Sequence, residues 1–338
     1  MLAIGKRWWL GSLCLLVAAG CGSTPEEKPQ AEGDAWYVAT DDLDRKVALA
    51  KPPQRIISLT PANTEILFAV GAGDKVVGVT TYCNFPPEAK ERAKVGGFLG
   101  KSINRETLLS LKPDLVLAGR SHDGILKDLD KFGIPVLVFE PQTIKDILRI
   151  TESLGRVTEQ EEQAKRVTAS FHLRLESVRA AVATIEEGET RSVFYELWDR
   201  PLTTAGNGSF IHELIVEAGG NNIFGDLDSP FPTVSEELLL VRNPAVILAP
   251  TSATTESKRL QILGRSSWSD IAAIANKDIH FIDEDIVSRP GPRVIDALEA
   301  MVSAIYPHLE FAADTQRDEK AQAEKVRVEK APSGGSPE

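Results

Sequence analysis

The sequence predicts an α/β protein with two Rossmann-like lobes joined by one long helix. Apolar, strand-like segments alternate with helical segments, which is typical of parallel sheets covered by helices. A stretch without Gly or Pro, residues 158–186, divides the chain, and the segments before it return in the same order after it. With 338 residues the chain is too long for one ordinary core and suits two domains with additional ends.

Residues 158–186 are the predicted connecting helix. Their apolar side chains recur at intervals of three or four, at Ala164, Val167, Phe171, Leu175, Val178, Val182 and Ile185. This spacing describes one face of a helix. About 28 residues at 1.5 Å each span roughly 40 Å, which is longer than a small domain is wide. We therefore expect the helix to hold lobes 38–157 and 187–310 at a nearly fixed separation.

The first lobe, residues 38–157, begins with a predicted hairpin at 38–50. RIISLT then predicts a strand, and Pro61 and Asn63 are suited to opening the helix that follows it. The remaining expected elements are a strand in KVVGVTTY, a helix at 105–111, a buried strand at 114–119, a helix at 123–132, a strand at 134–139 and a helix at 143–154.

The second lobe, residues 187–310, repeats this order. A strand is expected at 191–198, helices at 208–220 and 235–244, and a buried strand at 245–250. The most similar pair of segments is Glu106 to Pro113, followed by DLVLA, in the first lobe and Glu237 to Pro244, followed by AVILA, in the second. Two lobes of similar plan are expected to leave a ligand cleft between them, at the carboxyl ends of their strands.

The first 20 residues predict a lipoprotein signal peptide. Lys6 and Arg7 precede an apolar run too short to span a bilayer, and small residues lead into Cys21. The pattern resembles bacterial lipoprotein signals, which implies lipidation of Cys21; ordinary secretory cleavage is the alternative. Residues 21–37 are expected to form a flexible tether and residues 311–338 a charged disordered tail. The folded part is therefore expected in the periplasm or cell envelope, anchored to a membrane.

Composition and motifs argue against several functions. The 49 acidic and 38 basic residues give a net charge of -11, without the clustered basic face that nucleic acid requires. Five histidines are scattered without metal-site spacing, and no phosphate loop, dinucleotide fingerprint or nucleophile elbow is complete. We expect no enzyme and no metal site. Cys83 is expected to be an unpaired apolar residue, with a metal thiolate as the alternative.

Residues 38–310 resemble the helical-backbone metal-receptor class, class III, of periplasmic binding proteins. The resemblance rests on RIISLTPANTEILFAVGAGDKVVGVTTYCNFPPEA, VGGF, LKPDLVLAG, LTTAGNGSFIHELIVEAGGNNIF, TVSEELLLVRNP and RPGPR. It implies a protein without a catalytic cofactor that delivers a metal chelate to the ABC permease dimer of the inner membrane. SLTPANTE and TTYCNFPPEA are most similar to cobalamin-binding members, while haem or a ferric siderophore is the alternative ligand. We expect a monomer. A sensory or scaffold lipoprotein, or an exported hydrolase, remains an alternative function.

A corrinoid or porphyrin needs an apolar, aromatic cleft with a few polar groups. Such groups are expected at strand ends and turns, where backbone N–H groups could also meet an amide or carboxylate. The alternatives are a lobe-surface position for Tyr82, core packing for Phe98, packing under the Pro201 turn for Trp198, and a scaffold role for the arginines. The ligand-binding candidates are Pro61, Ala62, Asn63, Tyr82, Phe98, Trp198, Arg289 and Arg293.

Glu106 and Glu237 are the predicted docking residues. They occupy equivalent places near the starts of equivalent helices, one in each lobe. The resemblance implies that such a pair binds arginines of the permease dimer, and two carboxylates suit a symmetric partner. The alternative is the ordinary preference of acidic residues for first helical turns. That preference is also the interpretation we give to Glu65, as a cap or helix-dipole residue.

Overall fold

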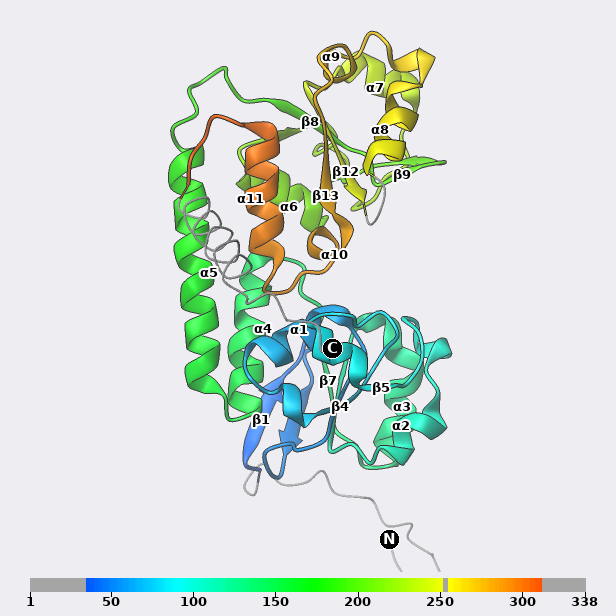
Figure 1. Cartoon of the computed structure of the whole chain (residues 1–338). Helices are drawn as coiled ribbons and strands as arrows, with labels where there is room; N and C mark the ends of the chain where they lie inside the picture. The colour runs from blue at the N-terminus through cyan, green and yellow to red at the C-terminus, as the bar shows by residue number, and fades with distance from the viewer. Residues whose placement is uncertain (1–34, 252–254, 312–338) are drawn as a thin grey trace, which may run out of the picture. The chain divides into compact units, whose positions relative to one another are not determined.

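The computed structural model describes residues 35–251 and 255–311 (Figure 1). The predicted signal peptide, Cys21, most of the tether and the tail from residue 312 onward lie outside the described residues. Tyr37 already belongs to the first strand and Phe311 is buried against the second lobe, so the folded part reaches one residue beyond each predicted end. Within these ranges no helix is long and apolar enough to cross a membrane.

The first lobe is a parallel sheet with helices on both faces, preceded by the expected hairpin of β1 (Tyr37–Thr40) and β2 (Lys46–Leu49). Its five strands are, in spatial order, β5 (Ala93–Lys94), β4 (Val76–Val79), β3 (Ile56–Ser58), β6 (Leu115–Ala118) and β7 (Val136–Val138). The helices α1 (Pro61–Ala69) and α4 (Ile144–Val157) cover one face, and α2 (Arg105–Ser110) and α3 (Asp123–Lys131) the other.

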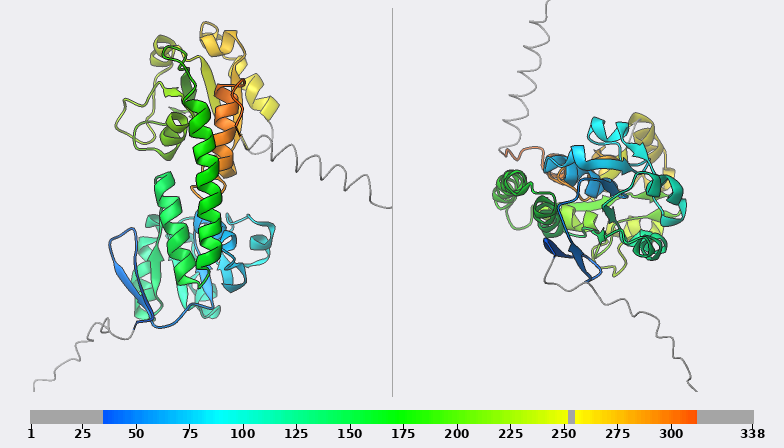
Figure 2. Two further views of the ribbon diagram at one scale, coloured as in Figure 1. Left: turned by 90° about the vertical axis from the view of Figure 1, so that its left-hand side faces the viewer. Right: turned by 90° about the horizontal axis from the view of Figure 1, so that it is seen from below.

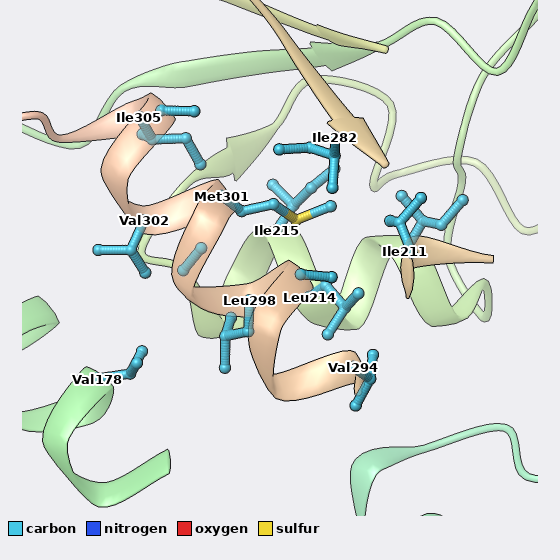
Figure 3. Close-up of a cluster of buried hydrophobic side chains, with 14 of the residues drawn as sticks. Val178, Ile211, Leu214, Ile215, Ile282, Val294, Leu298, Met301, Val302 and Ile305 are labelled. Carbon is cyan, nitrogen blue, oxygen red and sulfur yellow. The ribbon is translucent and has the colours of Figure 1, made fainter. Parts of the chain in front are cut away.

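The second lobe has a parallel sheet of four strands, in the order β11 (Asn221–Asn222), β8 (Ser192–Tyr195), β12 (Val246–Thr251) and β13 (Ile279–Asp283). A small hairpin of β9 (Trp198–Asp199) and β10 (Leu202–Thr203) follows β8. The helices are α6 (Phe210–Glu217), α7 (Glu236–Arg242), α8 (Thr255–Leu263), α9 (Ala272–Ala275), α10 (Glu284–Val287) and α11 (Val294–Ile305). Figure 3 shows the side chains of α6, α11 and β13 interdigitating in the core on one face.

The predicted internal repeat is confirmed by the sheet topology. The order β4, β3, β6, β7 in the first lobe corresponds to β11, β8, β12, β13 in the second. The equivalent helices of the repeat, α2 and α7, match in detail, because Leu108 and Leu239 are both fully buried. Lys112 and Asn243, the residues before the two prolines, both adopt a left-handed conformation, with φ of 47° and 41°. A following proline disfavours the right-handed helical region, so both helices end at this point.

The connecting helix is shorter than predicted. The structure has α5 at Glu161–Val182 instead of 158–186, preceded by α4, which ends at Val157. Glu159 is left-handed, with φ of 59°, and reverses the chain between the two helices. The helices run side by side (Figure 2), because Gly155 of α4 leaves room for the Ala164 side chain, which a Cβ would meet at 2.4 Å. The apolar stripe predicted a helix correctly but could not locate this turn.

The stripe of α5 belongs to both cores, as expected of a connecting helix. Ala164 packs into the core of the first lobe, while Phe171, Leu175 and Val178 pack into that of the second. Val178 faces α11 and α6 in Figure 3. One continuous helix therefore contributes to both lobes, and a nearly fixed separation of the lobes stays a prediction.

We predict that Phe171→Ala lowers the free energy of unfolding by about 3 kcal/mol, because it leaves a cavity where α5 meets the second lobe. Leu173→Ala is the matched control, because Leu173 lies on the same helix and is 69% exposed. Its loss should stay within about 0.5 kcal/mol. Urea unfolding measures both, and equal losses would contradict the assigned faces of α5.

Candidate ligand-binding site

Exposed aromatic side chains gather at the carboxyl edge of the first sheet. Tyr82 follows β4 and Phe98 follows β5, and they are 55% and 45% exposed. Their ring centroids lie 6.2 Å apart at an interplanar angle of 81°, an edge-to-face arrangement. The structure thus brings together two of the predicted ligand-binding residues. They present an apolar surface to solvent where a parallel α/β sheet usually binds its ligand.

His122 supports this aromatic pair and was missed by the sequence reasoning. It is fully buried just after β6, with its ring 6.4 Å from that of Phe98. Its Nδ1 accepts a hydrogen bond from the Gly119 N–H, 3.1 Å away. Burial lowers the pKa of His122, which favours the neutral ring. Its place directly after a buried strand, at the edge that carries Tyr82, was the available signal.

The second lobe contributes two more exposed aromatic side chains. Trp198 lies on β9, is 62% exposed, and donates its indole N–H to the Arg200 carbonyl at 3.0 Å, so the turn holds its polar edge. Phe231 is also exposed. Its loop is tied to the same hairpin, because Thr203 pairs with both Trp198 and Thr233. Phe231 was missed because its SPFPT surroundings carry no strand or helix pattern.

The two lobes are joined by a buried ion pair. Arg293 donates two hydrogen bonds to the Glu65 carboxylate, at 2.8 Å from Nε and 2.6 Å from Nη2. The Glu65 side chain is 2% exposed, and the Arg293 guanidinium also lies 3.8 Å above the Phe85 ring. The interpretation of Glu65 as a cap was wrong, because Thr60 caps α1 and Glu65 faces the other lobe.

The loop after β4 makes a second contact between the lobes. Asn84 donates to an Asp285 carboxylate oxygen at 3.0 Å and accepts from Arg289 at 2.5 Å. Arg289 also pairs with Asp285 and lies 3.7 Å from Glu65. Because Tyr82 belongs to the same short loop, the position of its ring depends on how this loop meets the second lobe. Both predicted arginines are engaged by protein groups in this arrangement.

Burial raises the pKa of Glu65 above its ordinary value, although Arg293 and Arg289 oppose the shift. A carboxylate removed from water is stable in its ionised form only with such partners. The arginines are therefore what allows an ionised Glu65 to remain in the contact between the lobes.

Comparison with known proteins identifies the family. Residues 56–286 match the family described as periplasmic binding protein. The chain belongs to this family. It is 33% identical over 310 residues to YvrC of Bacillus subtilis, an uncharacterized ABC transporter substrate-binding lipoprotein, in a match that covers 89% of this chain and 96% of the relative.

Two solved structures are similar to this binding protein. The periplasmic vitamin B12 binding protein BtuF of Vibrio cholerae has a TM-score of 0.65 at 32% identity, covering 75% of this chain and 97% of that one. A possible iron-binding, periplasmic solute-binding protein of Staphylococcus epidermidis has a TM-score of 0.66 at 31% identity, covering 76% and 100%. The chain is thus an extracytoplasmic substrate-binding protein of an ABC transporter.

The predicted turn residues of the binding protein lie deeper than the aromatic side chains. Pro61 and Ala62 are buried at the start of α1. Asn63 is fully buried and donates its side-chain amide to the Phe139 carbonyl at 3.1 Å, which joins α1 to the end of β7. Ligand contact by these three residues stays a prediction.

The described part of this binding protein has no concentration of metal-ligating groups. Across residues 35–251 and 255–311, no group of three or more His, Cys, Asp or Glu side chains is placed to hold a metal ion. Cys83 is buried in the core of the first lobe, with its sulfur 3.2 Å from the Thr80 hydroxyl. This is the environment expected of an unpaired apolar residue.

Glu106 and Glu237 occupy the same helical position in the two lobes of the binding protein. Each lies two residues after the N-cap, which is Asn104 in α2 and Ser235 in α7. Both side chains are exposed, and in the described part of the chain neither is paired with a cation. Hydrogen bonds from its own N–H and from Ser235 lower the pKa of Glu237, so its carboxylate is ionised at neutral pH.

We predict that Arg293→Met leaves the Glu65 carboxylate buried without its main partner. The free energy of unfolding at pH 7 should fall by about 3 kcal/mol relative to the wild type. In this variant Glu65 of the folded protein titrates further above its ordinary pKa. The loss should therefore shrink as the pH falls through that raised value towards about 4.3, where glutamate titrates in the unfolded chain. Urea unfolding at several pH values measures both effects.

The double variant Glu65→Gln/Arg293→Met is the control. It removes the buried charge, so it should regain part of the lost stability and lose the added pH dependence. A loss in Arg293→Met that is the same at pH 5 and pH 7 would contradict the buried charge as its cause.

Proposed function

We propose that the mature protein is a lipid-anchored binding protein that captures a corrinoid of the cobalamin type between its lobes and delivers it to an ABC permease. The observation that carries this proposal is the exposed edge-to-face pair of Tyr82 and Phe98 at the carboxyl edge of the first sheet. A corrinoid has broad faces and amide edges, and such rings give it apolar contact area at little entropic cost. The similarity to a vitamin B12 binding protein supports the same ligand.

The proposed ligand contacts come from both lobes. Tyr82 and Phe98 contact one part of the ligand and Trp198 another, while Pro61, Ala62 and Asn63 shape the floor between them. Arg289 and Arg293 form the wall, and their main role is to hold the Tyr82 loop against the second lobe through Asn84 and Phe85. The contact at Trp198 is made by an exposed ring whose orientation is already fixed by the hydrogen bond of its indole N–H.

Delivery is proposed to depend on two features outside the ligand site. Cleavage after residue 20 and lipidation of Cys21 tether the folded part to the membrane surface. Glu106 and Glu237 then bind cationic groups of the two permease subunits, because both carboxylates are exposed at equivalent positions of the repeat.

An iron chelate is the second candidate ligand, as haem or a ferric siderophore. The observation in its favour is that the possible iron-binding protein is as similar to this chain as the vitamin B12 binding protein is. A porphyrin is also flat and apolar, so the same aromatic pair would serve it. A sensory or scaffold role without transport would not require Glu106 and Glu237. Substitution of these two residues therefore distinguishes such a role from transport.

We predict that cyanocobalamin quenches the tyrosine and tryptophan fluorescence of the purified, unlipidated protein with saturation. Tyr82→Ala and Phe98→Ala should each weaken binding about tenfold, as expected for the loss of one aromatic contact. Phe132→Ala is the matched control, because Phe132 is also an exposed aromatic residue, at 61%, but lies at the far end of α3. Tighter binding of haemin or a ferric hydroxamate would assign the iron chelate instead, and failure of all three ligands would contradict both.

We predict that Glu106→Arg/Glu237→Arg abolishes uptake and leaves ligand affinity unchanged, because the reversed charges repel the cationic groups of the permease. Uptake of labelled ligand by cells and fluorescence titration of the purified protein measure the two properties. Glu187→Arg, an exposed site in the turn after α5, is the control and should transport normally. Lost affinity together with normal uptake would contradict the assigned roles.

A further inference from the structure

The outward face of α7 carries an exposed apolar pair. Val241 is 82% exposed and Leu238 is 36% exposed. Val241 lies three residues after Leu238 and four after Glu237, so the three side chains share one face of the helix. We call Glu237, Leu238 and Val241 the α7 stripe. It places a carboxylate directly beside an apolar patch.

The equivalent face of α2 is polar. In the repeat, Glu106, Thr107 and Ser110 stand where α7 has Glu237, Leu238 and Val241. Ser110 donates its hydroxyl to the Thr107 carbonyl at 2.7 Å, so this hydroxyl is satisfied within the helix. The inward positions do not differ, because Leu108 and Leu239 are both fully buried. Core packing therefore explains the inward side of both helices but not the apolar pair on α7.

The charges around the two glutamates differ as well. Beside Glu106, Arg105 pairs with Asp128 at 2.7 Å, so a cation stands next to this carboxylate. The equivalent residue on α7 is Glu236, which accepts a hydrogen bond from the Ser267 hydroxyl at 2.8 Å. Arg242, at the end of α7, is engaged by Asp226. The α7 stripe is thus acidic and apolar at once, and it calls for a partner that supplies both a cation and an apolar side chain.

We infer that the α7 stripe is the apolar half of the docking surface and that its occupant is a segment of the permease's external face with an Arg or Lys flanked by an apolar residue. This inference rests on the proposed docking of Glu106 and Glu237. The α2 half then contributes mainly charge attraction, which salt screens, while the α7 half also removes apolar surface from water, which salt does not weaken. The two halves of a repeated scaffold contribute unequally.

The first test identifies the occupant by photo-crosslinking in cells that make the protein. A benzophenone amino acid replaces Val241 in the full chain, and the crosslinked peptide is sequenced by mass spectrometry. We expect a polytopic membrane protein whose crosslinked peptide contains Arg or Lys next to apolar residues. Crosslinking to lipid alone, or to a second copy of this chain, would overturn the inference.

The second test measures docking of the purified protein to proteoliposomes. These proteoliposomes hold the permease that the crosslink identifies, without the crosslink itself. Leu238→Ser/Val241→Ser should weaken docking at least about tenfold and make the remaining docking steeply dependent on salt. In Glu106→Gln/Glu237→Gln the remaining docking should depend little on salt. Val216→Ser/Leu260→Ser is the matched control, because both residues are exposed apolar residues of the same lobe outside α7.

The outcomes separate the two proposals. If Glu106→Arg/Glu237→Arg docks like the wild type, the proposed docking by glutamates fails. If that variant loses docking while Leu238→Ser/Val241→Ser docks like the wild type, only the inference about the α7 stripe fails. An unchanged thermal midpoint in the serine variant shows that a loss of docking is not a loss of fold, as expected for exposed residues.

Discussion

The buried pair of Glu65 and Arg293 is the interaction on which the arrangement of the lobes depends. An ionised carboxylate that is 2% exposed costs several kcal/mol unless it is fully hydrogen-bonded, and its partner comes from the other lobe. Opening the contact would break this ion pair and expose both charged groups to water. Together with α5, which contributes to both cores, this pair favours a preformed site with small motions over a wide closure.

The same contact connects ligand recognition to lobe geometry. Asn84 binds Asp285 and Arg289 of the second lobe, while Tyr82, two residues earlier, belongs to the exposed aromatic pair. A shift of the second lobe would therefore move the loop that carries the Tyr82 ring. In the other direction, a ligand held by Tyr82 and Trp198 would stabilise the contacts between the lobes. Through such coupling, ligand binding could change the relative position of the lobes slightly, and the permease could distinguish the ligand-bound protein from the ligand-free protein.

Most of the fold could be predicted from the sequence, because its signals are local or repeated. The stripe of α5, the buried strand before Gly119 and the echo between α2 and α7 are all visible in short windows. The turn at Glu159 was missed because a single left-handed residue does not interrupt an apolar period. The role of Glu65 was missed for a different reason. Its partner is 228 residues away in the sequence, and nothing local distinguishes it from a carboxylate in a first helical turn.

The comparison of α2 with α7 shows where a repeated fold is free to differ. Inward positions must fill equivalent cores, so Leu108 and Leu239 are alike, whereas outward positions meet no constraint from the chain itself. An outward position can therefore be polar, as Ser110 is, or apolar, as Val241 is, without affecting the core. The proposed permease segment would cover the Val241 side chain, which is 82% exposed. Charge attraction acts over about 10 Å and speeds the encounter, whereas apolar contact acts only after water has left and slows dissociation. A surface with charge on both helices and apolar side chains on α7 alone can thus associate quickly with the permease. Its dissociation is then slowed mainly by the apolar contact at α7.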